Sequence, residues 1–362
     1  MSKEIDSTIR VKWYSTIFLL VGTILAFADP VTDILTLREF YLNDHKTWYE
    51  MGLVFVTYPR LIVSCIYLSR LFELDATPIV LISHAIFGGN PLMLALTRFQ
   101  AFILCFRNFK KLWHGKLGDE CNEQIKKLMY DETWFGMFEA ILGSAPQFVI
   151  QLHATIVQQE QVSTIQIVSL CASFLSLAWT SASADVWRFL TVLSSSPSRF
   201  IFITKVVFFI SQLFHLSSRL FAITFFIVGF KWWIIAVFVL HSIVMTFVRI
   251  WVDLTTDGKG AGCCDSVPHG CANFCLMPVF CLVYWIRDDG TIGITAHENY
   301  KSLTKMVFAS SILFMIENVI MICVFYAKEE PHAWYSVPVT VYVCVFSLVG
   351  FLLRILPLLV EK

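Results

Sequence analysis

The stretch WYSTIFLLVGTILAFADPVTDILTL, residues 13–37, decides the class of fold. A helix that crosses a bilayer needs about 20 mostly apolar residues, and this stretch is long enough. Lys3, Arg10 and Lys12 precede it, and it lacks the small-residue cleavage site of a signal peptide. We therefore expect it to remain in the protein as the first membrane span.

The whole sequence has the composition of a membrane protein. Of its 362 residues, 57% are hydrophobic and 15% are charged, which is too apolar for a soluble domain of this length. The eleven cysteines show no framework of paired spacings, so no disulfide scaffold is expected. Cofactors and nucleic-acid partners are not expected either.

Further apolar stretches follow along the chain. Seven are long enough to span a membrane: 48–72, 132–158, 162–187, 203–229, 232–253, 303–327 and 334–358. The sequence thus predicts an all-α membrane protein with about eight transmembrane helices. Two other apolar segments, 78–105 and 272–286, are broken by glycine or proline and are expected to insert only part of the way.

The distribution of basic residues predicts the topology. The segment after 78–105 carries the densest basic cluster: Arg107, Lys110, Lys111, Lys116, Lys126 and Lys127. Basic loops stay in the cytoplasm, so 78–105 is expected to form a hairpin that returns to the side it came from. Both termini then lie in the cytoplasm. The order of spans and half-insertions repeats, which predicts a single transmembrane domain, 1–362, made of two pseudo-repeats, 1–188 and 203–358.

Polar and charged residues lie deep inside the expected spans, where a charge costs a few kcal/mol. Those that we expect to line a path for lipid head groups are Asp29, Asp33, Arg98, Glu139, Gln147, Gln151, Asp185, Arg188, Arg219, Arg249, Asp253 and Glu317. Arg60 is a further charge in mid-span. The structural alternative is that these groups pair and hold the bundle together. For Arg219 we expect an ion pair with an intramembrane acid, and Asp29, Asp33 and Glu139 are the favoured partners.

At these residues the chain resembles the XK-related proteins. The matching pieces are FADPVTD (27–33), FEAILGSAPQFVIQL (138–152), SSRL (217–220) and IENV (316–319). The resemblance implies eight spans with two partly inserted helices, and calcium-independent phospholipid scrambling at the plasma membrane, without enzymatic chemistry. In several members caspases switch scrambling on during apoptosis and phosphatidylserine is exposed. Other members associate with a single-span membrane partner, and a homo-oligomer is the other arrangement expected.

The chain departs from the caspase-activated members in one respect. Asp6 is the only aspartate before the first span, none follows Asp289, and no Asp-x-x-Asp tetrad occurs. Either this chain is regulated in another way or the sequence lacks its tail. The alternative functions are a secondary transporter of small polar solutes and a non-catalytic structural membrane partner. Five cysteines between 263 and 281 lack a C-x-x-C pair, so packing or palmitoylation is favoured over a metal site.

Overall fold

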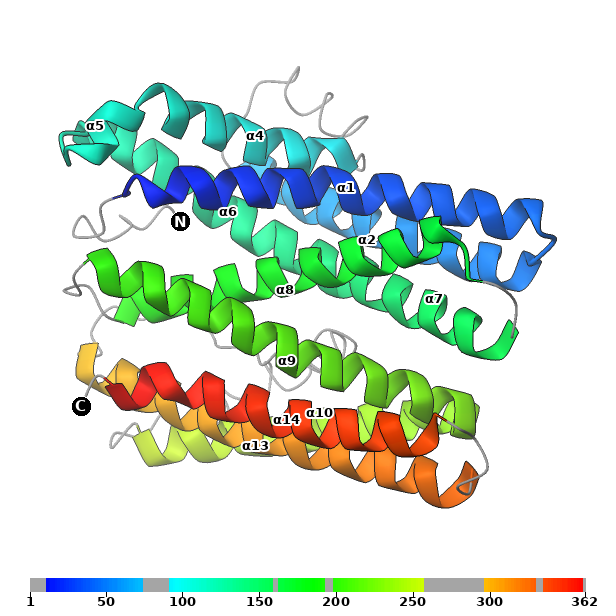
Figure 1. The fold of residues 1–362 in the computed structure, drawn as a ribbon. Coiled ribbons are helices and arrows are strands. Elements are labelled where there is room, and N and C mark those ends of the chain that lie inside the picture. The colour runs from blue at the N-terminus through cyan, green and yellow to red at the C-terminus, as the bar shows by residue number, and fades with distance from the viewer. Residues whose placement is uncertain are drawn as a thin grey trace. The chain divides into compact units, whose positions relative to one another are not determined.

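The computed structural model describes residues 11–73, 91–158, 162–192, 198–256, 296–329 and 335–360. Every regular element in these ranges is a helix (Figure 1). Helices are favoured because lipid offers no hydrogen bonds, so each backbone group must find a partner within the protein. The predicted all-α class is therefore confirmed for the described residues.

Six stretches of the described chain are long and apolar enough to cross a membrane: Tyr14–Leu42, Gly136–Val157, Thr164–Trp187, Phe202–Val248, Thr304–Lys328 and Ser336–Leu356. The stretch Phe202–Val248 has 47 residues, about 70 Å of helix, which is roughly twice the hydrocarbon thickness of a bilayer. The protein is thus a multi-pass membrane protein. The count of eight crossings stays a prediction, since residues 48–72 form a helix that is not among the six.

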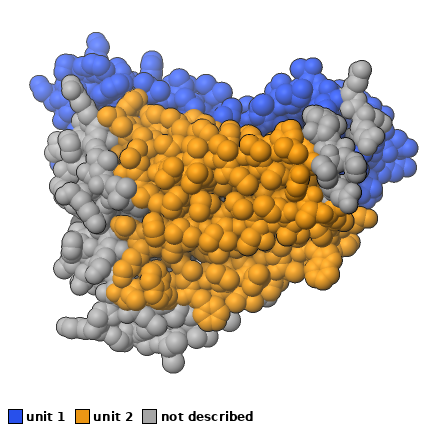
Figure 2. Space-filling view, turned by 60° about the horizontal axis from the view of Figure 1, so that its bottom comes forward, with its two compact units in different colours: residues 1–187 blue, residues 188–362 orange. Residues whose placement is uncertain are grey.

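Contacts divide the chain into two compact units, residues 1–187 and 188–362 (Figure 2). Unit 1 contains α1 (Tyr14–Leu42), α2 (Lys46–Glu73), α4 (Pro91–Arg107), α5 (Phe109–Trp113), α6 (Asp119–Glu139), the π-helical turn η1 (Ala140–Ser144), α7 (Ala145–Gln158) and most of α8 (Thr164–Val192). The helix α1 packs against α2 and α4, while α2 also packs against α6, η1 and α7. The expected pseudo-repeat stays a prediction.

The helices of unit 1 contain two internal prolines and one wider turn. Pro30 lies inside α1, Pro59 lies inside α2, and the wider turn η1 separates α6 from α7. Pro146 lies two residues after the end of η1, and in a regular α-helix its ring would clash with the carbonyl of Leu142, four residues earlier. A wider turn just before the proline relieves that clash, which accounts for the position of η1.

Unit 2 is built from α9 (Ser198–Phe230), the short 3-10 turn η2 (Lys231–Trp233), α10 (Ile234–Thr256), α13 (Ala296–Glu329) and α14 (Ser336–Val360). The helix α14 packs along α9, and α13 packs against α9, α10 and α14. Gly350 permits the close approach of α14, since a Cβ there would lie 2.9 Å from the backbone nitrogen of His215. Trp232 and Trp233 are exposed on η2.

Two expectations fall partly or wholly outside the described residues. The structure begins again at Pro91, the first residue of α4, so the turn of the 78–105 hairpin lies outside it. The stretch 272–286 and the cysteines between 263 and 281 also lie outside it.

Candidate functional site

Asp29 and Asp33 form the centre of a buried polar cluster in unit 1. They lie four residues apart on one face of α1, and only 8% and 4% of their surfaces are exposed. A carboxylate held away from water is stable only when its oxygens accept hydrogen bonds. The donors that supply these bonds come from η1, α7 and α8.

Two serine hydroxyls donate to Asp29. Ser144 Oγ of η1 lies 2.5 Å from Asp29 Oδ2, and Ser173 Oγ of α8 lies 2.6 Å from Asp29 Oδ1. Ser173 Oγ is also 3.2 Å from Asp33 Oδ1. A serine hydroxyl has one proton, so it donates to one carboxylate at a time and the shorter distance favours Asp29.

Asp33 accepts hydrogen bonds from α7 and α8. Its Oδ1 lies 3.0 Å from Ser169 Oγ and 3.2 Å from Gln151 Nε2. Gln151 Nε2 also lies 2.9 Å from Ser169 Oγ, so these three side chains form one network. The network joins three helices through neutral hydroxyl and amide groups.

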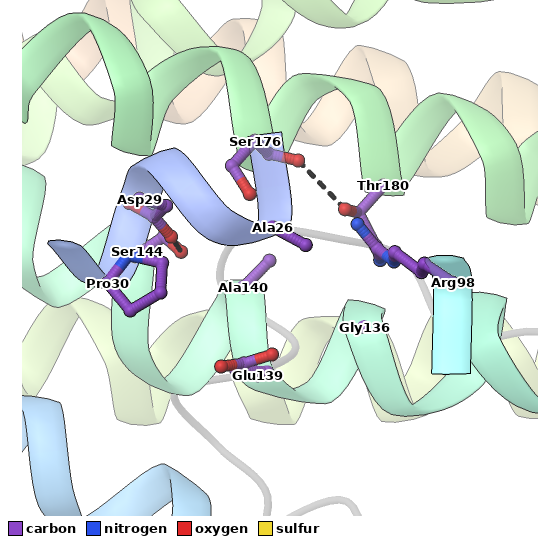
Figure 3. Close-up of a pocket in the computed structure, with 10 residues that line it drawn as sticks. All are labelled: Ala26, Asp29, Pro30, Arg98, Gly136, Glu139, Ala140, Ser144, Ser176 and Thr180. Carbon is purple, nitrogen blue, oxygen red and sulfur yellow. Dashed lines mark hydrogen bonds between the residues drawn. The ribbon is translucent and has the colours of Figure 1, made fainter. Parts of the chain in front are cut away.

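Two small cavities adjoin the cluster, each with room for about one water molecule. Asp29, Glu139 and Ser144 line both of them. The first cavity is shown in Figure 3, with the residues that line it: Ala26, Asp29, Pro30, Arg98, Gly136, Glu139, Ala140, Ser144, Ser176 and Thr180. The second reaches α2 at Phe55, Val56 and Pro59.

The irregular backbone of unit 1 surrounds these cavities. Pro30 lines the first cavity and Pro59 the second, while Ser144 of η1 lines both. Gly143 of η1 faces Pro59 of α2, because a Cβ on it would lie 3.5 Å from Pro59 Cγ. Irregular backbone at membrane depth is tolerated where it is buried or lines a polar space, and here it does so.

Arg98 enters the cluster from α4 through space left by glycine. Its side chain is 2% exposed and its Nη1 donates to the carbonyl oxygen of Gly22 in α1 at 3.1 Å. A Cβ on Gly136 of α6 would lie 2.1 Å from Arg98 Nη2. The guanidinium lies near Thr180 of α8 (Figure 3). Arg98 thus brings a positive charge to the same cavity as Asp29 and Glu139.

Gln147 lies apart from the acids. Its Nε2 donates to the carbonyl oxygen of Gly52 in α2 at 2.7 Å, and its side chain is 1% exposed. A Cβ on Gly52 would lie 2.4 Å from a methyl carbon of Leu37 and 3.5 Å from Gln147 Oε1. Gln147 therefore connects α7 to α2. This contact agrees with the alternative interpretation that the polar side chains hold the bundle together.

Unit 2 contains a separate buried network around Arg219 of α9. Arg219 Nη2 lies 2.8 Å from Glu317 Oε2 of α13, and Arg219 Nη1 donates to Asn318 Oδ1 at 3.0 Å. His241 Nδ1 of α10 lies 2.8 Å from the same carboxylate. The Arg219 guanidinium also lies 5.0 Å from the ring centre of Phe314.

The expected ion pair of Arg219 with an intramembrane acid is confirmed, but the favoured partners were wrong. Its acid is Glu317, a member of the same unit, whereas Asp29, Asp33 and Glu139 belong to unit 1. A charged residue in the middle of an apolar run needs a partner, but the sequence does not show which helix supplies that partner. Of the remaining expected residues, Asp185 is buried in α8. The side chains of Arg60, Arg188, Arg249 and Asp253 lie outside what the structure describes.

Several residues of the cluster were not anticipated. Ser169, Ser173, Ser176 and Thr180 recur on α8 at intervals of three or four residues. That spacing places hydroxyls along one face of a helix. The spacing is visible in the sequence and indicates a polar face on α8. Gly136 and Gly22 were also missed, because the need for a glycine here depends on a neighbouring helix.

The described residues bring together no group of three His, Cys, Asp or Glu side chains that could hold a metal ion. When the chain is compared with known protein families, the family of XK-related proteins matches residues 17–356, which is nearly the whole chain.

Proposed function

The chain belongs to the XK-related family, and from this we propose that it is a phospholipid scramblase. In this proposal lipids move between the two leaflets of the plasma membrane without energy input, and phosphatidylserine reaches the outer surface. Both termini would lie in the cytoplasm. The membrane phospholipids are the substrate, and a single-span protein or a second copy of the chain is the proposed partner.

The buried polar cluster of unit 1 is the observation that carries this proposal. Asp29 and Asp33 meet hydroxyl and amide donors from three other elements within a membrane-spanning bundle. These are groups that a zwitterionic or anionic head group also uses, since it offers phosphate oxygens and ammonium or hydroxyl protons. A head group could exchange its hydrogen bonds with water for bonds to this cluster.

The cavities beside the cluster set a condition on the mechanism. Each has room for about one water molecule, which is much less than a lipid head group needs. Lipid passage thus requires α1, α7 and α8 to separate, so that the contacts of Ser144, Ser169 and Ser173 break. The acyl chains stay in lipid while the polar groups guide the head group.

Reconstitution of the purified chain into liposomes tests the proposal. With a fluorescent lipid in both leaflets, dithionite bleaches only the outer leaflet unless a scramblase exchanges the lipids. We expect bleaching to continue beyond the outer-leaflet share when the protein is present. Bleaching that stops there, with folded protein in the liposomes and after caspase treatment as well, contradicts the proposal.

A pair of serine variants tests the location. Ser169→Ala with Ser173→Ala removes two hydroxyls that contact the acids and keeps helix propensity. We expect scrambling to slow about tenfold, as expected when about 1.4 kcal/mol of stabilisation of the moving head group is lost. The matched control is Ser310→Ala, because among the residues that the structure describes this buried serine bonds to carbonyls of its own helix. Equal rates in both variants would place the path elsewhere.

A further inference from the structure

The short helix α5 lies at one end of unit 1 (Figure 1). It carries Lys110, Lys111 and Trp113, and Phe106 lies near the end of the preceding helix α4. Lys110 and Lys111 are exposed, and so are Phe106 (62%) and Trp113 (58%). Leu112 is 2% exposed and belongs to the core cluster that includes Leu19 and Ala101. One residue thus anchors α5 while its neighbours face outward.

Hydrogen bonds from the backbone and from the Asn108 side chain hold α5 and the turns that flank it in a defined conformation. The side chain of Asn108 donates to the carbonyl oxygen of Leu104 at 2.9 Å, and the nitrogen of Leu112 donates to the carbonyl oxygen of Asn108, also at 2.9 Å. Gly115 has a φ of 65°, and the nitrogen of Lys116 donates to the carbonyl oxygen of Lys111 at 2.8 Å. The lysines therefore stand on an ordered turn.

An aromatic contact shows the level of α5 relative to the bilayer. The ring centres of Trp113 and Trp13 lie 5.0 Å apart, and Trp13 directly precedes the apolar stretch Tyr14–Leu42 of α1. Tryptophan favours the boundary between hydrocarbon and water. We therefore expect the exposed ring of Trp113 at the membrane surface, with the lysines of α5 beside it.

The charge at this end of unit 1 is positive. Between residues 107 and 116 there are four basic residues and no acid: Arg107, Lys110, Lys111 and Lys116. The nearest acids along the chain, Asp119 and Glu120, lie in the first turn of α6, where the helix dipole favours them. Glu123 is paired with the buried Lys126 at 2.7 Å. The lysines of α5 have no acid on their own turn.

We propose that Phe106, Lys110, Lys111 and Trp113 form a docking surface for anionic phospholipid head groups of the adjacent leaflet. The rings enter the boundary of the acyl region, and the lysines contact the phosphate and carboxylate groups of a lipid such as phosphatidylserine. This surface goes beyond the proposed function, because it binds lipid whether or not the chain scrambles it.

Lipid binding to the purified full chain in a neutral detergent tests this surface. Native mass spectrometry reports the apparent affinity for the first phosphatidylserine and for the first phosphatidylcholine. We expect the chain to prefer phosphatidylserine about tenfold, because each lysine near an anionic surface contributes several-fold in affinity. The double variant Lys110→Gln with Lys111→Gln should bind both lipids equally, and Trp113→Ala should weaken both.

The matched control is Lys46→Gln with Lys231→Gln, two exposed lysines on other turns of the protein. This control should keep the preference for phosphatidylserine. The proposal is overturned if the α5 variant keeps the preference, if the control loses it equally, or if inorganic phosphate displaces the bound lipid. None of these results depends on a scrambling rate, so they leave the test of the proposed function separate.

Discussion

The guanidinium of Arg98 occupies space that only a glycine at position 136 leaves free. A Cβ on Gly136 would lie 2.1 Å from Arg98 Nη2 and 3.3 Å from Thr180 Cγ2. Arg98 is nearly fully buried, so it has little room to move away. A small residue in α6 thus determines where a charge in α4 can lie.

We expect Gly136→Ala to lower the free energy of unfolding by about 1–3 kcal/mol, the usual cost of overpacking. Alanine in a helix is normally favoured over glycine by about 0.5–1 kcal/mol. A loss of stability in Gly136→Ala is therefore opposite to the usual change and indicates a clash with Arg98. Thermal unfolding of the purified protein measures the change. Gly118→Ala is the control, because no atom lies within 4 Å of its Cβ position. A stabilised Gly136→Ala variant would show that Arg98 can leave its slot.

The sequence identified the acids of the site and Gln151, but not the serines of α8 that bond to the acids. The spacing of Asp29 and Asp33 indicates that they share one face of α1, and burial indicates that they need partners. Which serines supply the hydrogen bonds depends on how α8 packs against α1, and the pattern of a single sequence does not contain that register. The same reason explains why Glu317 was not recognised as the partner of Arg219.

At the scale of elements, the turn η1 was also missed, although its cause is visible in the sequence. Apolar runs predicted the helices well, since length and apolarity are what lipid requires of a span. A proline within such a run commonly kinks the helix, but the structure accommodates Pro146 with a π-helical turn at Ala140–Ser144. A kink and a wider turn relieve the same clash, and here the wider turn packs against α2.

Deletion of Leu142 tests whether Pro146 causes this turn. Removing one residue from a π-helical turn restores a regular α-helix and keeps both flanking faces in place. We expect the deletion alone to destabilise the protein by about 3 kcal/mol, because the proline ring then clashes with the preceding turn. In a Pro146→Ala background the same deletion should cost much less. Thermal unfolding of the four proteins gives this cycle, and equal costs in both backgrounds would rule out the proline as the cause.

At the scale of the whole molecule, two exposed lysines lie near opposite ends of the helix α1. Lys116 lies in the turn after α5, at the end where α1 begins, and Lys46 starts α2, just after α1 ends. The 29 residues of α1 form about 43 Å of helix, which is enough to cross a bilayer. We therefore expect the two positions to lie on opposite sides of a membrane.

A cysteine at each position tests the predicted topology. In intact cells, Lys46→Cys should react with an impermeant maleimide, while Lys116→Cys should react only after permeabilisation, because basic segments stay in the cytoplasm. The unmodified chain provides the background, since Cys171 and Cys323 are exposed in the structure. Ready labelling of Lys116→Cys in intact cells would contradict the predicted topology of unit 1.

The length of α9 has a consequence for the membrane that holds the protein. Its 33 residues form about 50 Å of helix, whereas the hydrocarbon core of a bilayer is about 30 Å thick. Trp232 and Trp233 on η2 are 81% and 69% exposed, which suits a fixed position at one interface. Any hydrophobic mismatch is then absorbed at the other end of the helix or by its tilt. The helix is therefore long enough for a thick, sterol-rich bilayer, and in a thin bilayer unit 2 accommodates its length by tilting.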